Sequence, residues 1–216
     1  MKSIGIILAG GIGSRFGADK PKQYCEILGK EMILYSIDAF KNANNIDDFI
    51  VVLDKEQFEK GEIAARYGVK TVLGGSSRNE SFKNALDYIA VNFPNCEKIV
   101  ENNAACPMIT SDVLDKYIDF LDTYDYVETA FKITDALGAY DKRDCDREDF
   151  YLIQAPDAYR FKLLYKYFDK NSPLCHPAQQ LPKDSQGYQY FDYGANHKVT
   201  YPYDLEIVEI LMKNKK

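Results

Sequence analysis

Cationic side chains gather in a glycine-rich stretch near the start of the chain, and these residue types are suited to binding a phosphate chain. The stretch reads Leu8-Ala9-Gly10-Gly11-Ile12-Gly13-Ser14-Arg15-Phe16-Gly17-Ala18-Asp19-Lys20-Pro21-Lys22-Gln23-Tyr24. Glycines let the backbone turn tightly and point N–H groups at an anion, while Arg15, Lys20 and Lys22 can neutralise a triphosphate. Because the stretch directly follows the apolar run at 4–8, which is typical of a buried parallel strand, we interpret it as a phosphate-binding loop rather than a solvated surface turn.

The spacing of these glycines differs from that of two better-known phosphate-binding loops. A P-loop needs a glycine, four residues and then Gly-Lys-Ser or Gly-Lys-Thr, and no glycine here satisfies that spacing. The dinucleotide fingerprint needs a third glycine three residues after the second, but Gly17 comes one residue too late after Gly11 and Gly13. Asp54 follows the second apolar strand, where a dehydrogenase places its ribose-binding carboxylate. On these residues alone, an NAD-dependent oxidoreductase remains an alternative.

The elements that must position this loop alternate between short apolar runs and amphipathic segments. Such alternation predicts an α/β fold, with a Rossmann-like, mostly parallel sheet flanked by helices on both faces. Ligands of such sheets bind at the carboxyl ends of the strands, near the point where the strand order reverses. The expected strands are 4–8, 49–53, 70–73, 98–100, 126–133 and a last one near 198–200; the expected helices are 32–43, 56–67, 79–93, one capped by Ser111 and ending at Leu121, 161–168 and 203–213; and 171–190 is expected to be a loop.

The length of 216 residues fits a single domain over 1–216. One segment departs from the pattern, because residues 134–149 are highly charged and poor in core residues. A compact domain rarely holds such a stretch inside. We therefore predict an arm that projects from the body, and a possible dimerisation element.

Composition excludes several classes of function. A net charge of −6 and a pI of about 5.1 leave no basic excess for binding nucleic acid. No stretch approaches the roughly 20 apolar residues of a membrane span, and the first apolar run is too short for a signal peptide. The five cysteines form no Cys-x-x-Cys pair, so we expect free thiols and a cytoplasmic location. His176 and His197 have no acidic or cysteine neighbours at ligand spacing, and we predict that neither is catalytic.

Three ordered motifs resemble one enzyme family over nearly the whole chain. The first is the glycine-rich stretch itself, as Ala-Gly-Gly-x-Gly-x-Arg-Phe followed by Lys-Pro-Lys-Gln-Tyr. The others are Gly74-Gly75-Ser76-Ser77-Arg78-Asn79-Glu80-Ser81 and Asn196-His197-Lys198-Val199-Thr200 with Pro202 and Asp204-Leu205, while Gln154-Ala155-Pro156 stands at a Thr-Pro-Gln-like turn. These motifs resemble the 2-C-methyl-D-erythritol 4-phosphate and ribitol-5-phosphate cytidylyltransferases.

The resemblance implies a CTP-dependent nucleotidyltransferase that uses Mg²⁺, acts on a small phosphorylated alcohol and works as a homodimer. It implies that Arg15 and Lys22 hold the triphosphate, that Lys198 reaches it from the C-terminal side, and that Arg147 on the arm serves the partner's acceptor site. The residues implied are, for catalysis, Arg15, Lys22 and Lys198; for the nucleotide, Leu8, Ala9, Gly10, Gly11, Gly13, Gly75, Arg78, Ser81 and Ala104; and for the acceptor, Asn103, Cys106 and Arg147.

One motif departs from the family pattern. Where the family has His-Asp-Ala-x-Arg-Pro, this chain has Asn102-Asn103-Ala104-Ala105-Cys106-Pro107, and Asp135-Ala136 replaces an Asp-Thr pair. An amide is a weaker Mg²⁺ ligand than a carboxylate, and cysteine lacks the phosphate-binding fork of arginine. We therefore expect a cytidylyltransferase with an altered acceptor, which favours cell-surface polymer synthesis (capsule or teichoic-acid-like) over isoprenoid synthesis. The metal ligands stay open, and a methylerythritol phosphate enzyme or a non-catalytic nucleotide-binding relative remain alternatives.

Overall fold

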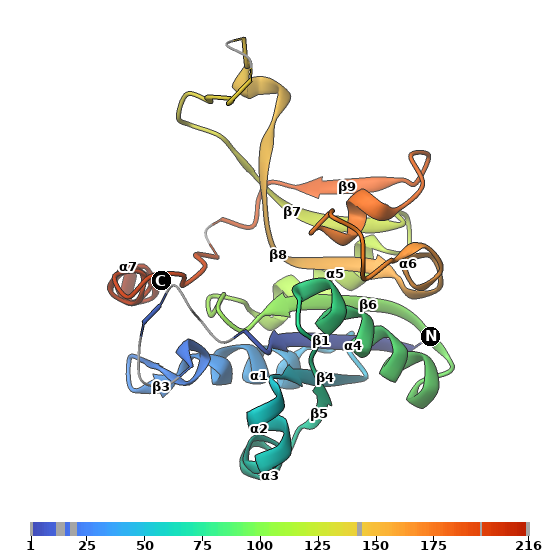
Figure 1. Ribbon diagram of the computed structural model, residues 1–216, viewed down its shortest axis with the longest axis vertical. Helices are drawn as coiled ribbons and strands as arrows, with labels where there is room; N and C mark the ends of the chain where they lie inside the picture. The colour runs from blue at the N-terminus through green and yellow to red at the C-terminus, as the bar shows by residue number, and fades with distance from the viewer. Residues whose placement is uncertain (1, 12–15, 18–20, 142–143, 195, 215–216) are drawn as a thin grey trace.

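The computed structural model describes residues 2–11, 16–17, 21–141, 144–194 and 196–214. Its centre is a seven-stranded sheet in the order β5-β4-β1-β6-β8-β7-β9 (Figure 1). Six strands run in one direction, and β8 alone is antiparallel to its two neighbours, β6 and β7. The mostly parallel sheet expected from the sequence is thereby confirmed. The strands are β1 (Lys2–Ala9), β4 (Asp48–Leu53), β5 (Lys70–Leu73), β6 (Cys96–Asn103), β7 (Tyr126–Lys132), β8 (Tyr151–Arg160) and β9 (Gly187–Tyr190).

Helices cover both faces of this sheet (Figure 1). One face packs against α1, α3 and α5 in a single apolar cluster, and the other packs against α4 and α6. A third cluster joins α7 to the small hairpin of β2 (Glu26–Ile27) and β3 (Lys30–Glu31). The helices are α1 (Met32–Asn42), α2 (Lys55–Lys60), α3 (Glu62–Tyr67), α4 (Arg78–Asn92), α5 (Ser111–Phe120), α6 (Phe161–Tyr167) and α7 (Asp204–Asn214).

Some predicted boundaries are wrong for local reasons. The helix expected over 56–67 is two helices, because Gly61 has φ of 66° and ends α2 before α3 begins. The helix expected to be capped by Ser111 is instead preceded by Thr110 in extended conformation and ends at Phe120, not Leu121. The strand expected at 98–100 is the middle of the eight-residue β6.

Three predictions near the C-terminus are wrong because strand pairing overrides local pattern. The stretch Gln154-Ala155-Pro156 is no turn; it lies inside β8, at an irregularity in its pairing with β7. Within the expected loop at 171–190, Gly187–Tyr190 adds β9 to the edge of the sheet. Residues 198–200, which were expected to form the last strand, are irregular instead.

The sheet contains a point where the strand order reverses. The chain begins in the middle with β1, adds β4 and β5 on one side, and then crosses to place β6 on the other side of β1. The loops after β1 and β6 therefore leave the same edge in opposite directions. This edge is where α/β sheets bind their ligands.

Residues 133–141 and 144–150, between β7 and β8, extend beyond the sheet in Figure 1, at the top of the view. This segment carries Tyr140, which is fully exposed, and the short 3-10 helix η2 (Arg147–Asp149). The single-domain organisation and the dimerisation role remain predictions. Among the described residues, no helix combines the length and apolarity needed to cross a bilayer. All five cysteines lie in the described part of the chain, and none forms a disulfide.

Candidate active site

Two glycines allow the loops after β1 and β5 to close on the end of β4. A Cβ atom on Gly10 would lie 3.3 Å from the Leu53 carbonyl carbon, and one on Gly74 would lie 2.9 Å from the Leu53 oxygen. The Gly74 N–H donates to that same oxygen at 2.7 Å. Larger residues would push these loops apart, so the sequence needs glycine here to build a compact carboxyl edge.

The second glycine loop is held in shape by the start of α4. The Gly75 N–H donates to Ser81 Oγ at 3.0 Å, and Ser77 Oγ caps the helix by accepting from Glu80 N–H at 3.0 Å. Gly75 is exposed and Ser81 is half-buried at this edge. The predicted nucleotide residues therefore lie in two places on either side of β4. Leu8, Ala9 and Gly10 are at the end of β1, while Gly75 lies in the loop after β5 and Ser81 in the first turn of α4.

Lys22, near the start of the chain, contacts the C-terminal segment that carries Lys198. Lys22 begins the 3-10 helix η1 (Lys22–Tyr24), and its Nζ donates to the Val199 carbonyl at 2.7 Å. Lys198, the neighbour of Val199, is exposed. The adjacent Gln23 side chain donates to the Ala9 carbonyl at 2.7 Å and fixes this helix to the end of β1. The structure thus brings together two of the three predicted catalytic cations, whereas Arg15, like the nucleotide residue Gly13, lies outside the described residues.

The altered motif after β6 forms a tight turn beside these lysines. The Ala104 N–H donates to the Leu8 carbonyl at 3.0 Å, which ties the turn to the end of β1. The Cys106 thiol is buried, and burial raises its pKa to about 12, with Lys198 and Lys22 acting in the opposite direction. Cys106 is therefore a neutral thiol close to both lysines. It supplies no charge with which to clamp an acceptor phosphate.

Asn103 stands where the resemblance implies a metal-binding aspartate, and it does not fit that role. Its amide is neutral, and its Oδ1 already accepts from the Ala105 N–H at 3.0 Å. Mg²⁺ prefers carboxylate and phosphate oxygens. Within the part of the chain that the structure describes, no group of three His, Cys, Asp or Glu residues could hold a metal ion. The requirement for Mg²⁺ stays a prediction.

Asn196 is the internal support of the C-terminal motif. It is fully buried, its Oδ1 accepts from Met108 N–H at 3.1 Å, and its Nδ2 donates to the Ala155 carbonyl at 2.9 Å. The Val199 N–H also donates to the Ala105 carbonyl at 2.8 Å. The segment carrying Lys198 is thus attached to the turn after β6, which explains why an irregular segment can place a lysine accurately.

Asp204 holds the other side of this segment. Its Oδ2 accepts from the backbone N–H groups of Thr200 and Tyr201 at 2.7 and 2.8 Å, and its Oδ1 lies 3.1 Å from His197 Nε2. Burial acts to raise the pKa of Asp204, but these hydrogen bonds outweigh burial and lower the pKa below its ordinary value of 3.8. His197, predicted to be non-catalytic, has a structural partner here.

We expect Asp204→Asn to destabilise the fold by about 2 kcal/mol at pH 7, because hydrogen bonds to a charged acceptor contribute about 1.5–3 kcal/mol. A carboxylate with a lowered folded-state pKa contributes stability above its unfolded pKa and loses it as pH falls through the folded value. The difference between variant and wild type should therefore shrink as pH falls below 3.8. Urea unfolding at pH 7 and at low pH measures this difference in stability, and replacement of the exposed Asp192 by asparagine is the control. An equal difference at both pH values would contradict this account.

Two residues predicted for substrates lie elsewhere or are already engaged. Arg147 is on the projecting segment, where its Nη1 donates to the Thr134 carbonyl and its Nε lies 3.3 Å from Glu148 Oε1. Arg78, at the first residue of α4, donates to Glu101 Oε1 at 2.5 Å and to the Cys175 carbonyl at 2.9 Å. Their substrate roles remain predictions, since both side chains have partners within the protein.

Sequence reasoning missed the acidic surroundings of His176. Its Nε2 lies 3.2 Å from Asp157 Oδ2, and its Nδ1 lies 3.6 Å from Glu128 Oε2. Burial acts to lower the pKa of His176, but Asp157 and Glu128 outweigh it and raise the pKa above 6.5. No local spacing reveals this cluster, because its members lie on two strands and a loop. The signal in the sequence was only the presence of acidic residues inside otherwise apolar strands.

A hollow of about 600 Å³ lies at the opposite edge of the sheet, lined among others by Glu97, Asp125 and Arg160. These residues belong to the start of β6, the approach to β7 and the end of β8. None of the three motifs reaches that edge. We therefore place the candidate active site at the carboxyl edge, where the motifs converge.

The fold is that of the α/β nucleotidyltransferases. It superimposes with a TM-score of 0.83 on the crystal structure of 4-diphosphocytidyl-2C-methyl-D-erythritol synthase from Anaerococcus prevotii, covering 99% of this chain and 96% of that one at 22% sequence identity. The chain belongs to the IspD family, 2-C-methyl-D-erythritol 4-phosphate cytidylyltransferase, whose family model matches residues 4–214. This membership confirms the resemblance seen in the motifs.

Relatives within the family differ in the acceptor named for them. The chain is 30% identical over 192 residues to a 2-C-methyl-D-erythritol 4-phosphate cytidylyltransferase of Bifidobacterium longum subsp. infantis, a match that covers 81% of this chain but only 65% of that enzyme. It is 28% identical to a bifunctional ribulose 5-phosphate reductase/CDP-ribitol pyrophosphorylase of Haemophilus influenzae, covering 78% of this chain and 38% of that protein. The family alone therefore leaves the acceptor open.

Family membership removes the oxidoreductase alternative. Asp54, which motivated it, serves a different purpose in the structure. Its Oδ1 accepts from Gln57 N–H at 3.1 Å and caps the N-terminus of α2. Asp54 is thus a helix cap. From the sequence alone, an aspartate between a strand and a helix could equally have been a ribose ligand.

Proposed function

We propose that this protein transfers a cytidylyl group from CTP to the phosphate of a small phosphorylated alcohol and releases pyrophosphate. The observation that carries the proposal is the meeting of Lys22 with the Lys198–Val199 segment beside the two glycine loops. Cations from both ends of the chain and the backbone of Gly10–Gly11 and Gly75 all lie at the carboxyl edge of the sheet. Family membership supports cytidine as the base.

In the proposed reaction, an oxygen of the acceptor phosphate attacks the α-phosphorus of CTP. A new P–O–P bond forms, the bond between the α-phosphorus and the bridging oxygen breaks, and its electron pair leaves with pyrophosphate. The second pKa of a phosphate monoester is about 6, so the attacking oxygen is already largely ionised near neutral pH. No general base is needed, which agrees with the structural engagement of His176 and His197.

The task of the protein is then positioning and charge stabilisation. Negative charge grows on the oxygens around the α-phosphorus and on the leaving pyrophosphate. Lys22 and Lys198 are placed to stabilise this charge, and the resemblance adds Arg15 to them. We expect Mg²⁺ to enter bound to the triphosphate of its substrate, held mainly by phosphate oxygens and water, because Asn103 is unsuited to hold it.

We propose an acceptor other than methylerythritol phosphate. Arginine forms a two-pronged contact with phosphate that a buried neutral thiol cannot make, and Cys106 stands at that position with a pKa of about 12. The CDP-ribitol pyrophosphorylase among the relatives supports a polyol phosphate. A CDP-linked polyol would serve the synthesis of a capsule or teichoic-acid-like cell-surface polymer.

We further propose that the protein acts as a homodimer in which the projecting segment serves the partner. Residues 133–141 and 144–150 extend away from the sheet (Figure 1). Tyr140, Phe150 and Leu152, in or next to this segment, are exposed apolar residues. A contiguous patch of such residues would mark a contact surface. Arg147 would then approach the acceptor site of the second copy.

Pyrophosphate release is the direct test. The protein is mixed with MgCl₂, one of the four nucleoside triphosphates and one acceptor from a panel of ribitol, glycerol, arabinitol, mannitol and methylerythritol phosphates, phosphocholine and aminoethylphosphonate. We expect release only with CTP, and fastest with a polyol phosphate. Mass spectrometry of the CDP-linked product identifies the acceptor.

The alternatives give different results in the same assay. Fastest turnover with methylerythritol phosphate would support the isoprenoid enzyme and overturn the proposed acceptor. CTP binding without release across the panel would favour a non-catalytic relative. Equal release with several nucleoside triphosphates would contradict the cytidine assignment.

A further inference from the structure

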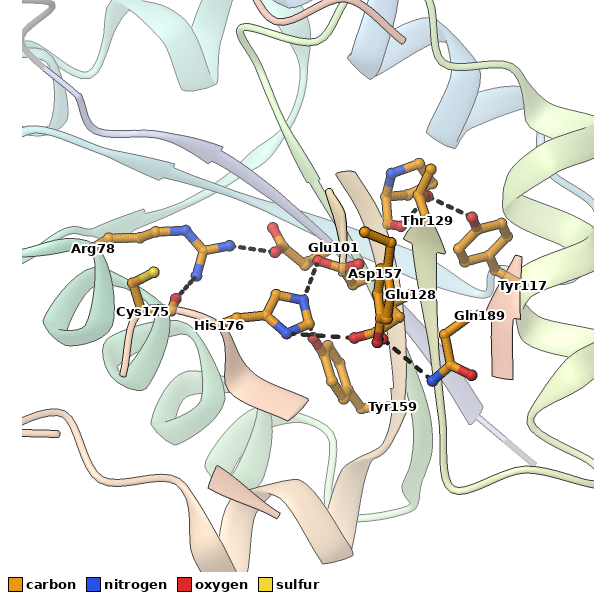
Figure 2. Close-up of polar contacts among 12 residues, drawn as sticks. Arg78, Glu101, Tyr117, Glu128, Thr129, Asp157, Tyr159, Cys175, His176 and Gln189 are labelled. Atoms are coloured by element: carbon orange, nitrogen blue, oxygen red, sulfur yellow. Dashed lines mark hydrogen bonds and ion pairs between the residues drawn. The ribbon is translucent and has the colours of Figure 1, made fainter. Parts of the chain in front are cut away.

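Three carboxylates are buried side by side in the sheet, next to the candidate active site. They are Glu101 on β6, Glu128 on β7 and Asp157 on β8, each at most 3% exposed. Figure 2 shows them gathered around His176, with Arg78 reaching in from α4. Buried carboxylates are costly unless they are paired, so this cluster depends on its cations.

The sheet register sets the geometry of the cluster. Glu101 lies directly opposite Asp157 in the β6–β8 pair, and Glu128 lies opposite Asp157 in the β7–β8 pair. Like charges so placed repel one another. Within the described residues, the cations that face them are Arg78, at 2.5 Å from Glu101 Oε1, and His176, at 3.2 Å from Asp157 Oδ2.

Arg78 joins three separate segments of the chain. It directly follows the glycine loop at 74–77, its Nη2 donates to Glu101, and its Nη1 donates to the Cys175 carbonyl at 2.9 Å, one residue before His176 (Figure 2). Glu101 directly precedes Asn102, the first residue of the altered acceptor motif. The Arg78–Glu101 pair is thus a direct connection between the nucleotide loop and the acceptor turn.

Asn102 continues this connection to the acceptor turn. It is fully buried, and its Nδ2 donates to the Cys106 carbonyl at 3.2 Å and to Ser36 Oγ at 3.0 Å. A displacement of Glu101 would therefore move Asn102 and the turn that follows. Motion of the glycine loop and motion of the acceptor turn are linked through one ion pair.

We propose that Arg78 is a positioning residue that acts through Glu101, holding the glycine loop and the acceptor turn in the geometry that binds CTP. This inference rests on the proposed function and assigns Arg78 a partner in the protein instead of a phosphate of the substrate. The two roles predict opposite results when Glu101 is also changed. Glu101 is fully buried, whereas the Arg78 side chain is partly exposed. Removal of Arg78 alone therefore leaves a buried carboxylate without its cation, and removal of both partners takes that buried charge away as well.

The test is a double-mutant cycle of Arg78→Met and Glu101→Gln, with the dissociation constant for CTP measured by calorimetry in MgCl₂. We expect Arg78→Met to weaken CTP binding about tenfold, in line with coupling between contacting residues. The double variant should recover to within about threefold of Glu101→Gln alone. If Arg78 contacts the triphosphate instead, the double variant binds as weakly as Arg78→Met, and the inference is overturned.

The exposed Lys60–Glu56 pair on α2, at 2.6 Å, provides a control cycle. Lys60→Met, Glu56→Gln and their combination should leave CTP affinity within about twofold, because exposed pairs contribute little. If Arg78→Met does not fold, Arg78→Lys replaces it. Lysine keeps the charge but cannot contact Glu101 and the Cys175 carbonyl together. We therefore expect Arg78→Lys to lose part of the CTP affinity, and the addition of Glu101→Gln to cause no further loss of affinity. A further loss in that double variant would overturn the inference.

A pH profile gives a second readout. Burial raises the pKa of Glu101, and Arg78 opposes this rise, while Asp157 adds to it and His176 opposes it. Without Arg78, the carboxylate becomes charged and unpaired as pH rises, so the ratio of Arg78→Met to wild-type dissociation constants should increase between pH 5.5 and pH 8. Glu101→Gln should abolish that increase. Its persistence would mean that another group, such as His176 or Asp157, is responsible.

Failure of the two proposals can be told apart. Wild-type protein that binds CTP but releases no pyrophosphate counts against the proposed function alone, since the binding cycle still reports on Arg78. Wild-type protein that binds no CTP overturns both. Normal CTP affinity in Arg78→Met overturns only the positioning role.

Discussion

Replacement of Lys22 by alanine is expected to lower kcat/KM for CTP about a thousandfold. Lys22 lies beside the end of β1, and its Nζ donates to the Val199 carbonyl at 2.7 Å. Its ammonium is therefore at the carboxyl edge of the sheet, where we propose that the triphosphate binds. Removing one donor that stabilises transition-state charge typically costs about 10²–10³-fold in rate. Lys22 also holds the segment that carries Lys198, which adds to the loss. Steady-state pyrophosphate release, with the acceptor found in the panel, measures the effect.

Lys41→Ala is the matched control for this change. Lys41 Nζ donates to the Tyr67 carbonyl at 2.8 Å, the same kind of contact, on α1 and away from the carboxyl edge. We expect this variant to retain activity within about twofold, because surface substitutions away from the site have small effects. Comparable melting temperatures for the two variants would show that the loss in Lys22→Ala is catalytic. Turnover of Lys22→Ala within tenfold of wild type would refute the assignment of Lys22.

Asn196→Ala should have the largest effect on stability. The fully buried amide accepts from the Met108 N–H and donates to the Ala155 carbonyl, and its removal breaks both hydrogen bonds. Removing one partner of a buried hydrogen bond costs about 1–3 kcal/mol, so we expect a loss of about 3 kcal/mol in the free energy of unfolding. For a chain of this length that corresponds to a melting temperature roughly 6–12 °C lower.

Thermal and urea unfolding measure this loss, with Asn92→Ala as control. Asn92 is exposed at the end of α4, where its Nδ2 donates to the Tyr88 carbonyl at 2.9 Å. Its replacement should change stability by less than about 0.5 kcal/mol. Equal melting temperatures for the two variants would show that Asn196 does not hold the C-terminal segment in place.

The altered acceptor motif changes meaning once its surroundings are known. The sequence shows only that the motif lacks the aspartate and the arginine of the family pattern. In the structure, Asn103 is a backbone-bonded turn residue and Cys106 is a buried thiol. The Ala105 N–H donates to Asn103 Oδ1 and the Ala104 N–H donates to the Leu8 carbonyl, so hydrogen bonds hold the turn without either charge. The acceptor panel tests our proposal that this site serves a different substrate.

The sequence by itself determined the class of fold and the family, and it predicted the phosphate loop. Apolar runs such as 4–8 and 49–53 signal buried strands because side chains on both faces of a parallel sheet must be apolar. Gly10 and Gly74 lie so close to the Leu53 backbone that a side chain would crowd it. Glycines required in this way can be recognised in the sequence. Apolar runs and glycine motifs are local signals, because each can be recognised from consecutive residues in the sequence.

Only the tertiary structure decided which side chains are partners. It placed the Lys198–Val199 segment beside Lys22, paired Arg78 with Glu101, and surrounded His176 with carboxylates, although none of these residues are neighbours in sequence. It also made 151–160 an antiparallel strand and 198–200 an irregular segment, against their local patterns. The physical reason is that burial and charge pairing depend on the register of strands that lie far apart in sequence. A carboxylate in β6 becomes the partner of an arginine in α4 only when the sheet has formed.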